Sequence, residues 1–156
     1  MGNLADRIEE YIKQILAQTE EGFILLQRGI LAEIFSCVPS QINYVLDTRF
    51  TEERGYLVES RRGGGGYLRI VRLGISQDGL IQQAMRQLIG DSLSQERAFG
   101  LLDRLYEEEI LSLREREIIK AVLGREGLGR EHGEQDVVRA HLMKRILTTL
   151  CREDLE

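Results

Sequence analysis

The chain has 156 residues, 42% of them apolar, and its 21 Lys and Arg against 26 Asp and Glu give a formal net charge of −5. This length suits one domain or two small ones, and the acidic total argues against indiscriminate coating of nucleic acid. No charged-then-apolar leader and no long apolar run is present, so we expect a cytoplasmic protein with no membrane partner.

The first elements are predicted to be a helix, a short strand and a second helix. Asn3 followed by Asp6 is typical of a helix N-terminus, and the apolar residues that follow recur at helical spacing. They are Leu4, Ile8, Ile12, Ile15 and Leu16. The apolar run 23–26 indicates a short strand, and Gly29 is expected to serve as N-cap of a helix at 30–35.

A third helix is predicted to begin at the only proline of the chain, Pro39, or at the next residue, Ser40. Proline suits a first helical position, where its missing N–H is not needed. The helix is expected to continue to Thr48, with Ile42, Val45 and Leu46 buried on one face. Its outward face is then polar but scarcely charged.

A β-hairpin is predicted next, because the β-forming segments 56–58 and 67–71 bracket four consecutive glycines. Four arginines fall within the twelve residues 61–72, which contain no acid. Without Cβ atoms the glycine tip can enter a space as narrow as a DNA minor groove, roughly 6 Å wide, whose negative potential attracts arginine. The alternative is a flexible surface turn with incidental charges.

The second half is predicted to be helical. Residues 74–79 are typical of a linker, and an amphipathic helix is expected to follow near 80–89. Capping-box spacing at Ser92 with Gln95, and again at Ser112 with Glu115, predicts two further helices, the second ending at Gly124. A last helix is expected to carry an apolar stripe of Val137, Val138, His141, Leu142, Ile146 and Leu150. Stripes this wide leave apolar surface that dimerisation would bury.

The order helix, strand, helix, turn, helix and hairpin is that of a winged helix-turn-helix. The expected fold class is therefore mainly α with a small β-wing (α+β). We expect a DNA-binding domain at residues 1–73, a linker at 74–79 and an α-helical dimerisation domain at 80–156. In such a fold the third helix enters the major groove, while the hairpin, or wing, reaches the backbone or the neighbouring groove.

The candidate DNA-binding residues follow from this arrangement. Asn and Gln can pair bidentately with adenine, and hydroxyls can donate to phosphates or base edges. Arg28 and Arg49 flank the helices and are placed to reach phosphates; the alternative for each is an ordinary surface arginine. Arg62 is expected to lie deepest in the groove, because it directly adjoins the glycine run and guanidinium is weakly hydrated. Tyr67 is expected either to pack beneath the wing or to contact sugar and phosphate. The predicted set is Arg28, Ser40, Gln41, Asn43, Tyr44, Thr48, Arg49, Arg61, Arg62, Gly63, Gly64, Gly65, Gly66 and Tyr67.

Other site chemistries find little support in the sequence. The glycine run lacks the Lys-Ser/Thr and the following helix of a phosphate-binding loop. Cys37, Cys151, His132 and His141 lack metal-ligand spacing. No serine, cysteine or carboxylate lies in a recognisable catalytic pattern. We therefore expect no enzyme, no metal and no cofactor.

Several segments resemble the CtsR family, the bacterial class III stress-gene repressors. They are residues 37–45, 47–51, 53–56, 58–60 and 62–67, and the resemblance is tight over 3–75 and looser beyond, where 111–117 and 143–144 are recognisable. It implies a homodimeric repressor of chaperone and protease genes on a double-stranded DNA operator with a tandem heptanucleotide repeat. It also implies a third helix in the major groove and a glycine wing in the minor groove.

The resemblance further implies release by heat and control by a protein arginine kinase, with Arg62 as the phosphorylation candidate. Such a modification would turn a cation into an anion that faces the DNA backbone. An adaptor and the Clp protease machinery are further partners that the resemblance implies. The rival hypothesis is a protein–protein adaptor of a chaperone or kinase system that does not bind DNA.

Overall fold

A computed structural model describes residues 2–61, 66–74, 88–129 and 134–155. The chain divides into two units, Met1–Gly74 with Arg152–Glu156 and Ile75–Cys151. The last residues thus belong to the first unit, whereas the sequence analysis placed them in the dimerisation domain. Most of the predicted linker 74–79, and the helix predicted near 80–89 as far as residue 87, lie outside the described residues.

The first unit begins with the predicted helix, strand and helices: α1 (Leu4–Gln18), β1 (Phe23–Gln27), α2 (Arg28–Ile34) and α3 (Pro39–Arg49). Asn3 and Asp6 form a reciprocal capping box at the start of α1. Pro39 occupies the first turn of α3, as predicted. The prediction of Gly29 as N-cap is wrong, because β1 runs into α2 without a loop and Gln27 takes that position with no side-chain cap.

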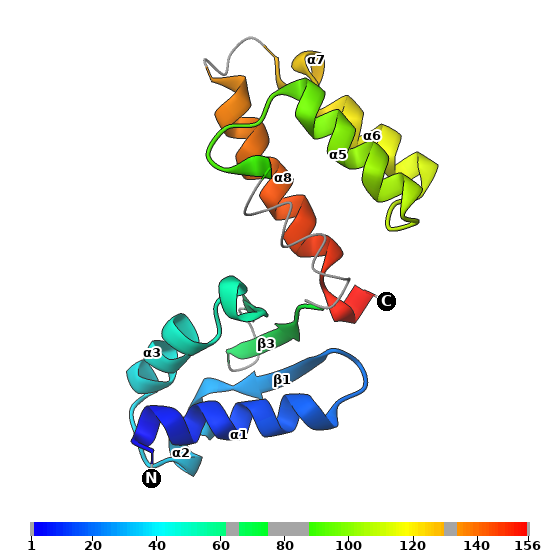
Figure 1. Ribbon diagram of the computed structural model, residues 1–156. Coiled ribbons are helices and arrows are strands. Elements are labelled where there is room, and N and C mark those ends of the chain that lie inside the picture. Colours follow the sequence, from blue (N-terminus) through cyan, green and yellow to red (C-terminus); the bar gives the residue numbers. More distant parts are fainter. Residues whose placement is uncertain (1, 62–65, 75–87, 130–133, 156) are drawn as a thin grey trace. The chain divides into compact units, whose positions relative to one another are not determined.

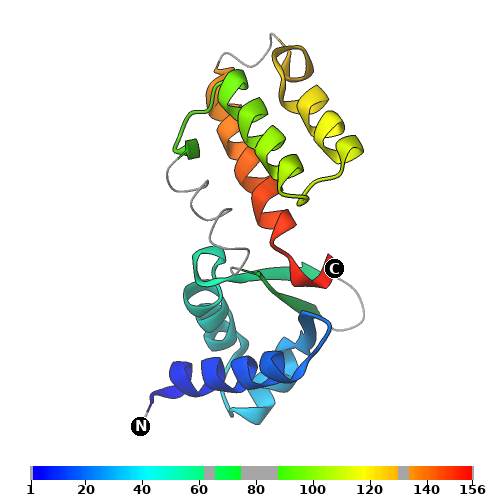
Figure 2. The ribbon, with the colours of Figure 1, turned by 45° about the vertical axis from the view of Figure 1, so that its right-hand side comes forward.

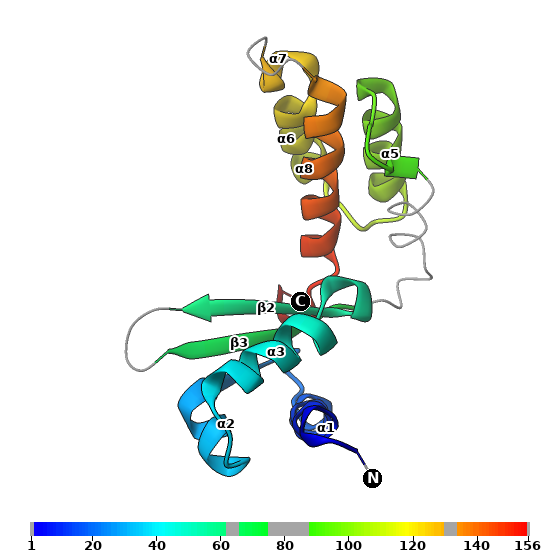
Figure 3. The ribbon, with the colours of Figure 1, turned by 90° about the vertical axis from the view of Figure 1, so that its left-hand side faces the viewer.

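A three-stranded antiparallel sheet completes this unit. After the short 3-10 turn η1 (Glu52–Arg54), strand β2 (Tyr56–Arg61) pairs with β3 (Tyr67–Arg72), which confirms the predicted hairpin. The spatial order is β1-β3-β2, so β3 is the central strand. Figure 3 shows the β2–β3 hairpin extending beside α2 and α3. Residues 62–65, which include most of the glycine tip, lie outside the described residues.

The three helices bury one face of the sheet (Figure 1). Alternation along β3 directs Leu68 and Ile70 towards the helices, whereas Arg69 and Val71 point to the opposite face. The core on the helical side consists of Ile8, Ile12, Leu16, Ile24, Leu31, Ala32, Ile42, Val45, Leu46, Phe50, Leu68 and Ile70. Burial of the predicted apolar face of α3 turns its polar face towards solvent.

The C-terminal tail, residues 152–155, packs on the sheet after the chain leaves α8 (Figure 2). Its backbone forms a bridge between Leu73 and Arg152, and Asp154 accepts from Arg69 and from Arg152 at 2.8 Å each. Glu153 pairs with Arg72, and Arg152 pairs with Glu59 of β2 at 2.9 Å. The acidic tail therefore neutralises arginines of β3 that lie more than 80 residues earlier in the chain.

Asp154 is the centre of this attachment. Its side chain is fully buried, and hydrogen bonds from Arg152 and Arg69 lower its pKa to about 2. Because the folded pKa lies below that of the free carboxyl, the stabilisation is complete above about pH 4 and is lost as the pH falls towards 2.

We predict that Asp154→Asn lowers the free energy of unfolding of the first unit by about 2 kcal/mol at pH 7, the amount that the depressed pKa implies. The loss should shrink as the pH falls from 4 towards 2. Urea denaturation, monitored through hydrogen exchange of the β3 amides, measures this loss of unfolding free energy. Asp91→Asn, at an exposed carboxyl of the second unit, is the matched control. Equal stability of the two variants at pH 7 would contradict the role given to Asp154.

The second unit contains α5 (Gln95–Glu107), α6 (Leu113–Leu123), α7 (Arg125–Leu128) and α8 (Gln135–Leu150). The capping box of Ser112 with Glu115 and the end of α6 at Gly124 are confirmed. The predicted cap at Ser92 is wrong, because Ser94 accepts from the Arg97 N–H and is the N-cap of α5. Leu93 is buried, and its N–H bonds to the Asp136 carbonyl, so the helix starts later.

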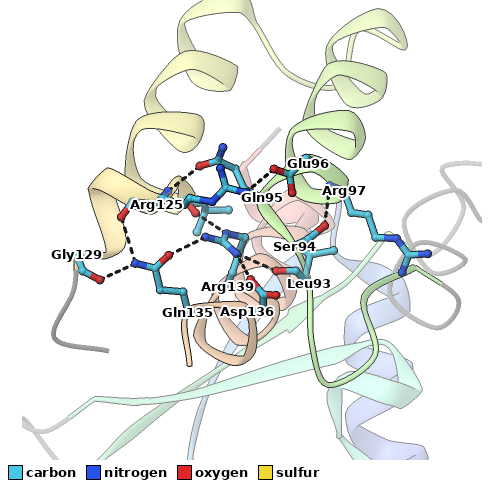
Figure 4. Close-up of polar contacts among 11 residues, drawn as sticks. Leu93, Ser94, Gln95, Glu96, Arg97, Arg125, Gly129, Gln135, Asp136 and Arg139 are labelled. Carbon is cyan, nitrogen blue, oxygen red and sulfur yellow. Dashed lines mark hydrogen bonds and ion pairs between the residues drawn. The ribbon is translucent and has the colours of Figure 1, made fainter. Parts of the chain in front are cut away.

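A buried arginine, Arg139 of α8, joins the elements of this unit (Figure 4). It is only 1% exposed. Its Nε donates to the Leu123 carbonyl at 2.7 Å, and its Nη1 donates to the Leu93 carbonyl at 3.0 Å and to the Asp136 carboxylate at 2.6 Å. These bonds satisfy the carbonyl at the end of α6 and the carbonyl just before α5. One side chain of α8 therefore holds the C-terminus of α6 and the N-terminus of α5.

The buried face of α8 is not the predicted apolar stripe. Its buried residues are Arg139, Ala140, Met143, Leu147 and Thr148. Of the predicted stripe, Val137 and His141 are exposed and the other four residues are half-buried, with Val137 at 45% exposure. On α6, Leu113, Ile118 and Val122 are each more than half exposed. These side chains are apolar surface that the described residues leave uncovered.

We predict that Arg139→Met destabilises the second unit by about 3 kcal/mol, because two buried carbonyls and a carboxylate lose their donor. Chemical denaturation monitored by circular dichroism measures the loss. Arg114→Met, at an exposed position of α6, serves as control for the loss of a positive charge. If the Arg139→Met variant were as stable as this control, Arg139 would not be needed to join the helices.

Candidate nucleic-acid interface

The polar residues of α3 form one exposed face. Ser40, Gln41, Asn43, Tyr44 and Thr48 are all exposed, and Tyr44 is 59% exposed. Ile42, Val45 and Leu46 on the other side of the helix are buried in the core, so the face is held in a fixed orientation. The Thr48 hydroxyl donates to the Tyr44 carbonyl at 2.7 Å, so its oxygen can accept a further hydrogen bond, and a DNA contact by Thr48 stays a prediction.

Arg28, the first residue of α2, connects this face to the sheet. Its Nε donates to Asn43 Oδ1 at 2.7 Å, and its Nη2 donates to Ser60 Oγ at 2.9 Å. Both partners are neutral, and Arg28 forms no ion pair with a carboxylate among the residues that the structure describes. Its positive charge is therefore available to an anion such as a phosphate.

Arg49 differs from Arg28 although the sequence suggested the same role for both. Its Nη1 binds Asp6 at 2.8 Å and Glu9 at 2.6 Å, so the end of α3 is tied to α1. The Asp6 and Glu9 carboxylates raise the pKa of Arg49, and Arg49 in turn lowers the pKa of Asp6. The two acids neutralise its charge, which argues against the phosphate contact that the sequence suggested for Arg49.

The described part of the wing supplies backbone and one aromatic ring. Arg61 pairs with Tyr67 across the hairpin, and Gly66 has a φ of +75°, a conformation that favours glycine. Tyr67 is 39% exposed, so part of its ring is open to solvent, and both packing beneath the wing and contact with sugar and phosphate stay predictions. The predicted residues Arg62, Gly63, Gly64 and Gly65 lie outside the described residues.

The structure thus brings Arg28 and Asn43 together and adds Ser60, which the sequence did not indicate. No pattern in the sequence marked Ser60, because its partner lies 32 residues away. The described residues include no cluster of three or more His, Cys, Asp or Glu that could hold a metal ion. None of the helices described is both long and apolar enough to cross a membrane.

Comparison with known proteins decides the family. The family model for the CtsR N-terminal HTH domain matches residues 3–74, and the model for the CtsR C-terminal dimerization domain matches residues 77–148. The chain belongs to the CtsR family. Relatives named "Transcriptional regulator CtsR" from Staphylococcus aureus strains USA300 and NCTC 8325 are each 42% identical to it, over 96% of this chain and 98% of their own length.

A solved CtsR structure is also similar. In the crystal structure of CtsR in complex with a 26bp DNA duplex, the CtsR chain is 44% identical in sequence to this one. The match covers 95% of this chain and 98% of the CtsR chain, with a TM-score of 0.50. The CtsR family membership confirms the resemblance drawn from the hairpin and third-helix segments. The mainly helical fold with a small sheet and a helix-turn-helix domain is also confirmed.

Proposed function

We propose that this protein is a dimeric, sequence-specific DNA-binding transcriptional repressor of the cytoplasm. The observation that carries the proposal is the exposed polar face of α3, with Asn43 held against the uncompensated charge of Arg28. Base edges are read by such amides, and phosphates are bound by such arginines. The match to the CtsR helix-turn-helix domain and the DNA complex of a 44% identical relative support it.

The proposed operator is a tandem heptanucleotide repeat upstream of chaperone and protease genes, as the family resemblance implies. Helix α3 lies in the major groove and the glycine wing enters the minor groove, with Arg61, Arg62 and Tyr67 as its contacts. The hairpin geometry supports this arrangement, because β2 and β3 project from the same unit that carries α3 (Figure 3). Glycines at the tip permit close approach of the backbone.

Two copies of the chain bind one operator in this proposal. The match of residues 77–148 to a dimerization domain supports it, as do the exposed apolar side chains of the second unit. Leu113, Ile118 and Val122 on α6, and Val137 on α8, are 45% to 55% exposed. Apolar surface grouped on few helices is typical of an interface.

Release of the repressor is proposed to follow from heat or from phosphorylation of Arg62. Four consecutive glycines lose much conformational entropy when the wing is ordered on DNA, and this cost weighs more as temperature rises. A phosphate on Arg62 would repel the backbone. A protein arginine kinase, an adaptor and the Clp protease machinery are the partners that this regulation requires.

The rival is an adaptor that binds a chaperone or kinase and no DNA. A fluorescence-anisotropy titration separates the two, with the full chain added to a duplex that carries the tandem repeat and to a scrambled duplex. The repressor is expected to bind the repeat alone, more weakly on warming below its melting temperature. Equal and weak binding to both duplexes at physiological salt would overturn the proposed function.

The contrast between Arg28 and Arg49 gives a second prediction. Arg28→Gln should reduce the slope of log affinity against log salt by about 0.9, the value for one lost phosphate contact. Arg49→Gln, with its charge already neutralised by Asp6 and Glu9, should leave that slope unchanged and lower thermal stability instead. Anisotropy titrations at four salt concentrations measure both slopes, and equal reductions would contradict the distinction.

We also predict that Arg62→Ala weakens operator binding at least tenfold while the dimer and the melting temperature stay unaltered. A minor-groove arginine contributes to binding and not to the folded core. Sedimentation velocity and thermal denaturation accompany the titration. If the variant lost its dimer, Arg62 would have a structural role; if its operator affinity were unchanged, the wing would not enter the groove.

A further inference from the structure

One side chain spans the two elements that the proposed function assigns to different grooves. Arg28 bonds at once to Asn43 of α3 and to Ser60 of β2, at 2.7 Å and 2.9 Å. Since β3 lies between β1 and β2, and Arg28 directly follows β1, the Arg28–Ser60 bond links one edge strand to the other. The wing and the recognition helix are therefore connected through side chains as well as through the core.

We propose that Ser60 is a positioning residue that sets, through Arg28, the orientation in which Asn43 reads a base. This inference rests on the proposed function and adds a residue to it. Ser60 need not touch DNA. The Ser60 hydroxyl accepts a hydrogen bond from the Arg28 guanidinium, which in turn donates to the Asn43 amide oxygen. These two hydrogen bonds couple α3 to strand β2 of the wing.

The chemistry of the two groups fixes the direction of the amide. An arginine Nε–H can only donate, so the oxygen of Asn43, and not its nitrogen, faces Arg28. The amide NH₂ then points away from the guanidinium, and Oδ1 keeps a second lone pair. Pairing with adenine requires an Asn that donates to N7 and accepts from N6, which this fixed orientation allows. An amide free to flip offers its two groups in either order.

The guanidinium is held at two of its five N–H groups. Loss of the Ser60 hydroxyl leaves it held by Asn43 alone, at an exposed site where water competes for the freed donor. Arg28 and Asn43 can then rotate about the hydrogen bond that remains between them. A net contribution of one such hydrogen bond corresponds to roughly a three- to tenfold change in an equilibrium constant.

The test begins with a duplex that the full-length protein selects from a random pool. A set of variant duplexes is then made, in each of which one A·T pair of the site is replaced by G·C. Ser60→Ala should reduce the discrimination at the base read by Asn43 roughly three- to tenfold, with discrimination elsewhere and melting temperature unchanged. In an Arg28→Ala background the same substitution should have no further effect. Ser92→Ala, an exposed serine of the second unit, is the control.

Additive losses in the two backgrounds, or unchanged discrimination in Ser60→Ala, would overturn the inference. A readout without DNA separates this failure from failure of the proposed function. The ¹⁵N signal of Arg28 Nε–H in the free protein should be protected from exchange with water and should lose that protection in Ser60→Ala. If this network is present but the wild-type protein selects no sequence, the proposed function fails; if protection is the same in both proteins, the positioning role fails.

Discussion

Strand β3 is the element on which the first unit depends, because it pairs with both other strands and supplies buried side chains to the core. Leu68 and Ile70 meet the three helices on one face of the sheet, and Arg69 meets the C-terminal tail on the opposite face. The wing is the extension of β3 and β2. A change in the pairing of β3 would therefore alter the position of the wing and of α3 together.

The distribution of charge in the described part of this unit separates arginines that are paired with carboxylates from Arg28, which is not. Arg49 is neutralised by two acids of α1, and Arg69 and Arg72 are neutralised by the acidic tail. Arg28 is held by neutral groups. A protein with an overall charge of −5 can in this way keep positive charge available to a polyanion while the ion-paired arginines Arg49, Arg69 and Arg72 stabilise the fold.

Local patterns in the sequence predicted the structural features that depend on residues close together in the chain. The capping box at Asn3, the start of α3 at Pro39 and its buried face follow from spacing alone, and the glycine run flanked by β-forming residues predicted the hairpin. What the sequence analysis missed depends on distant pairs. The tail binds β3 across more than 80 residues, and Ser60 meets Arg28 across 32. Arg139 was missed because a charged residue among apolar ones is normally solvated, whereas here two carbonyls compensate its burial.

We propose that one domain reads both grooves of the same site, with α3 in the major groove and the wing in the minor groove. Dimethyl sulfate interference on a duplex selected by the protein tests it most directly, because the reagent methylates guanine N7 in the major groove and adenine N3 in the minor groove. The account predicts that both modifications inhibit binding, at neighbouring positions of each half-site. Inhibition from one groove alone, or from neither, would contradict it.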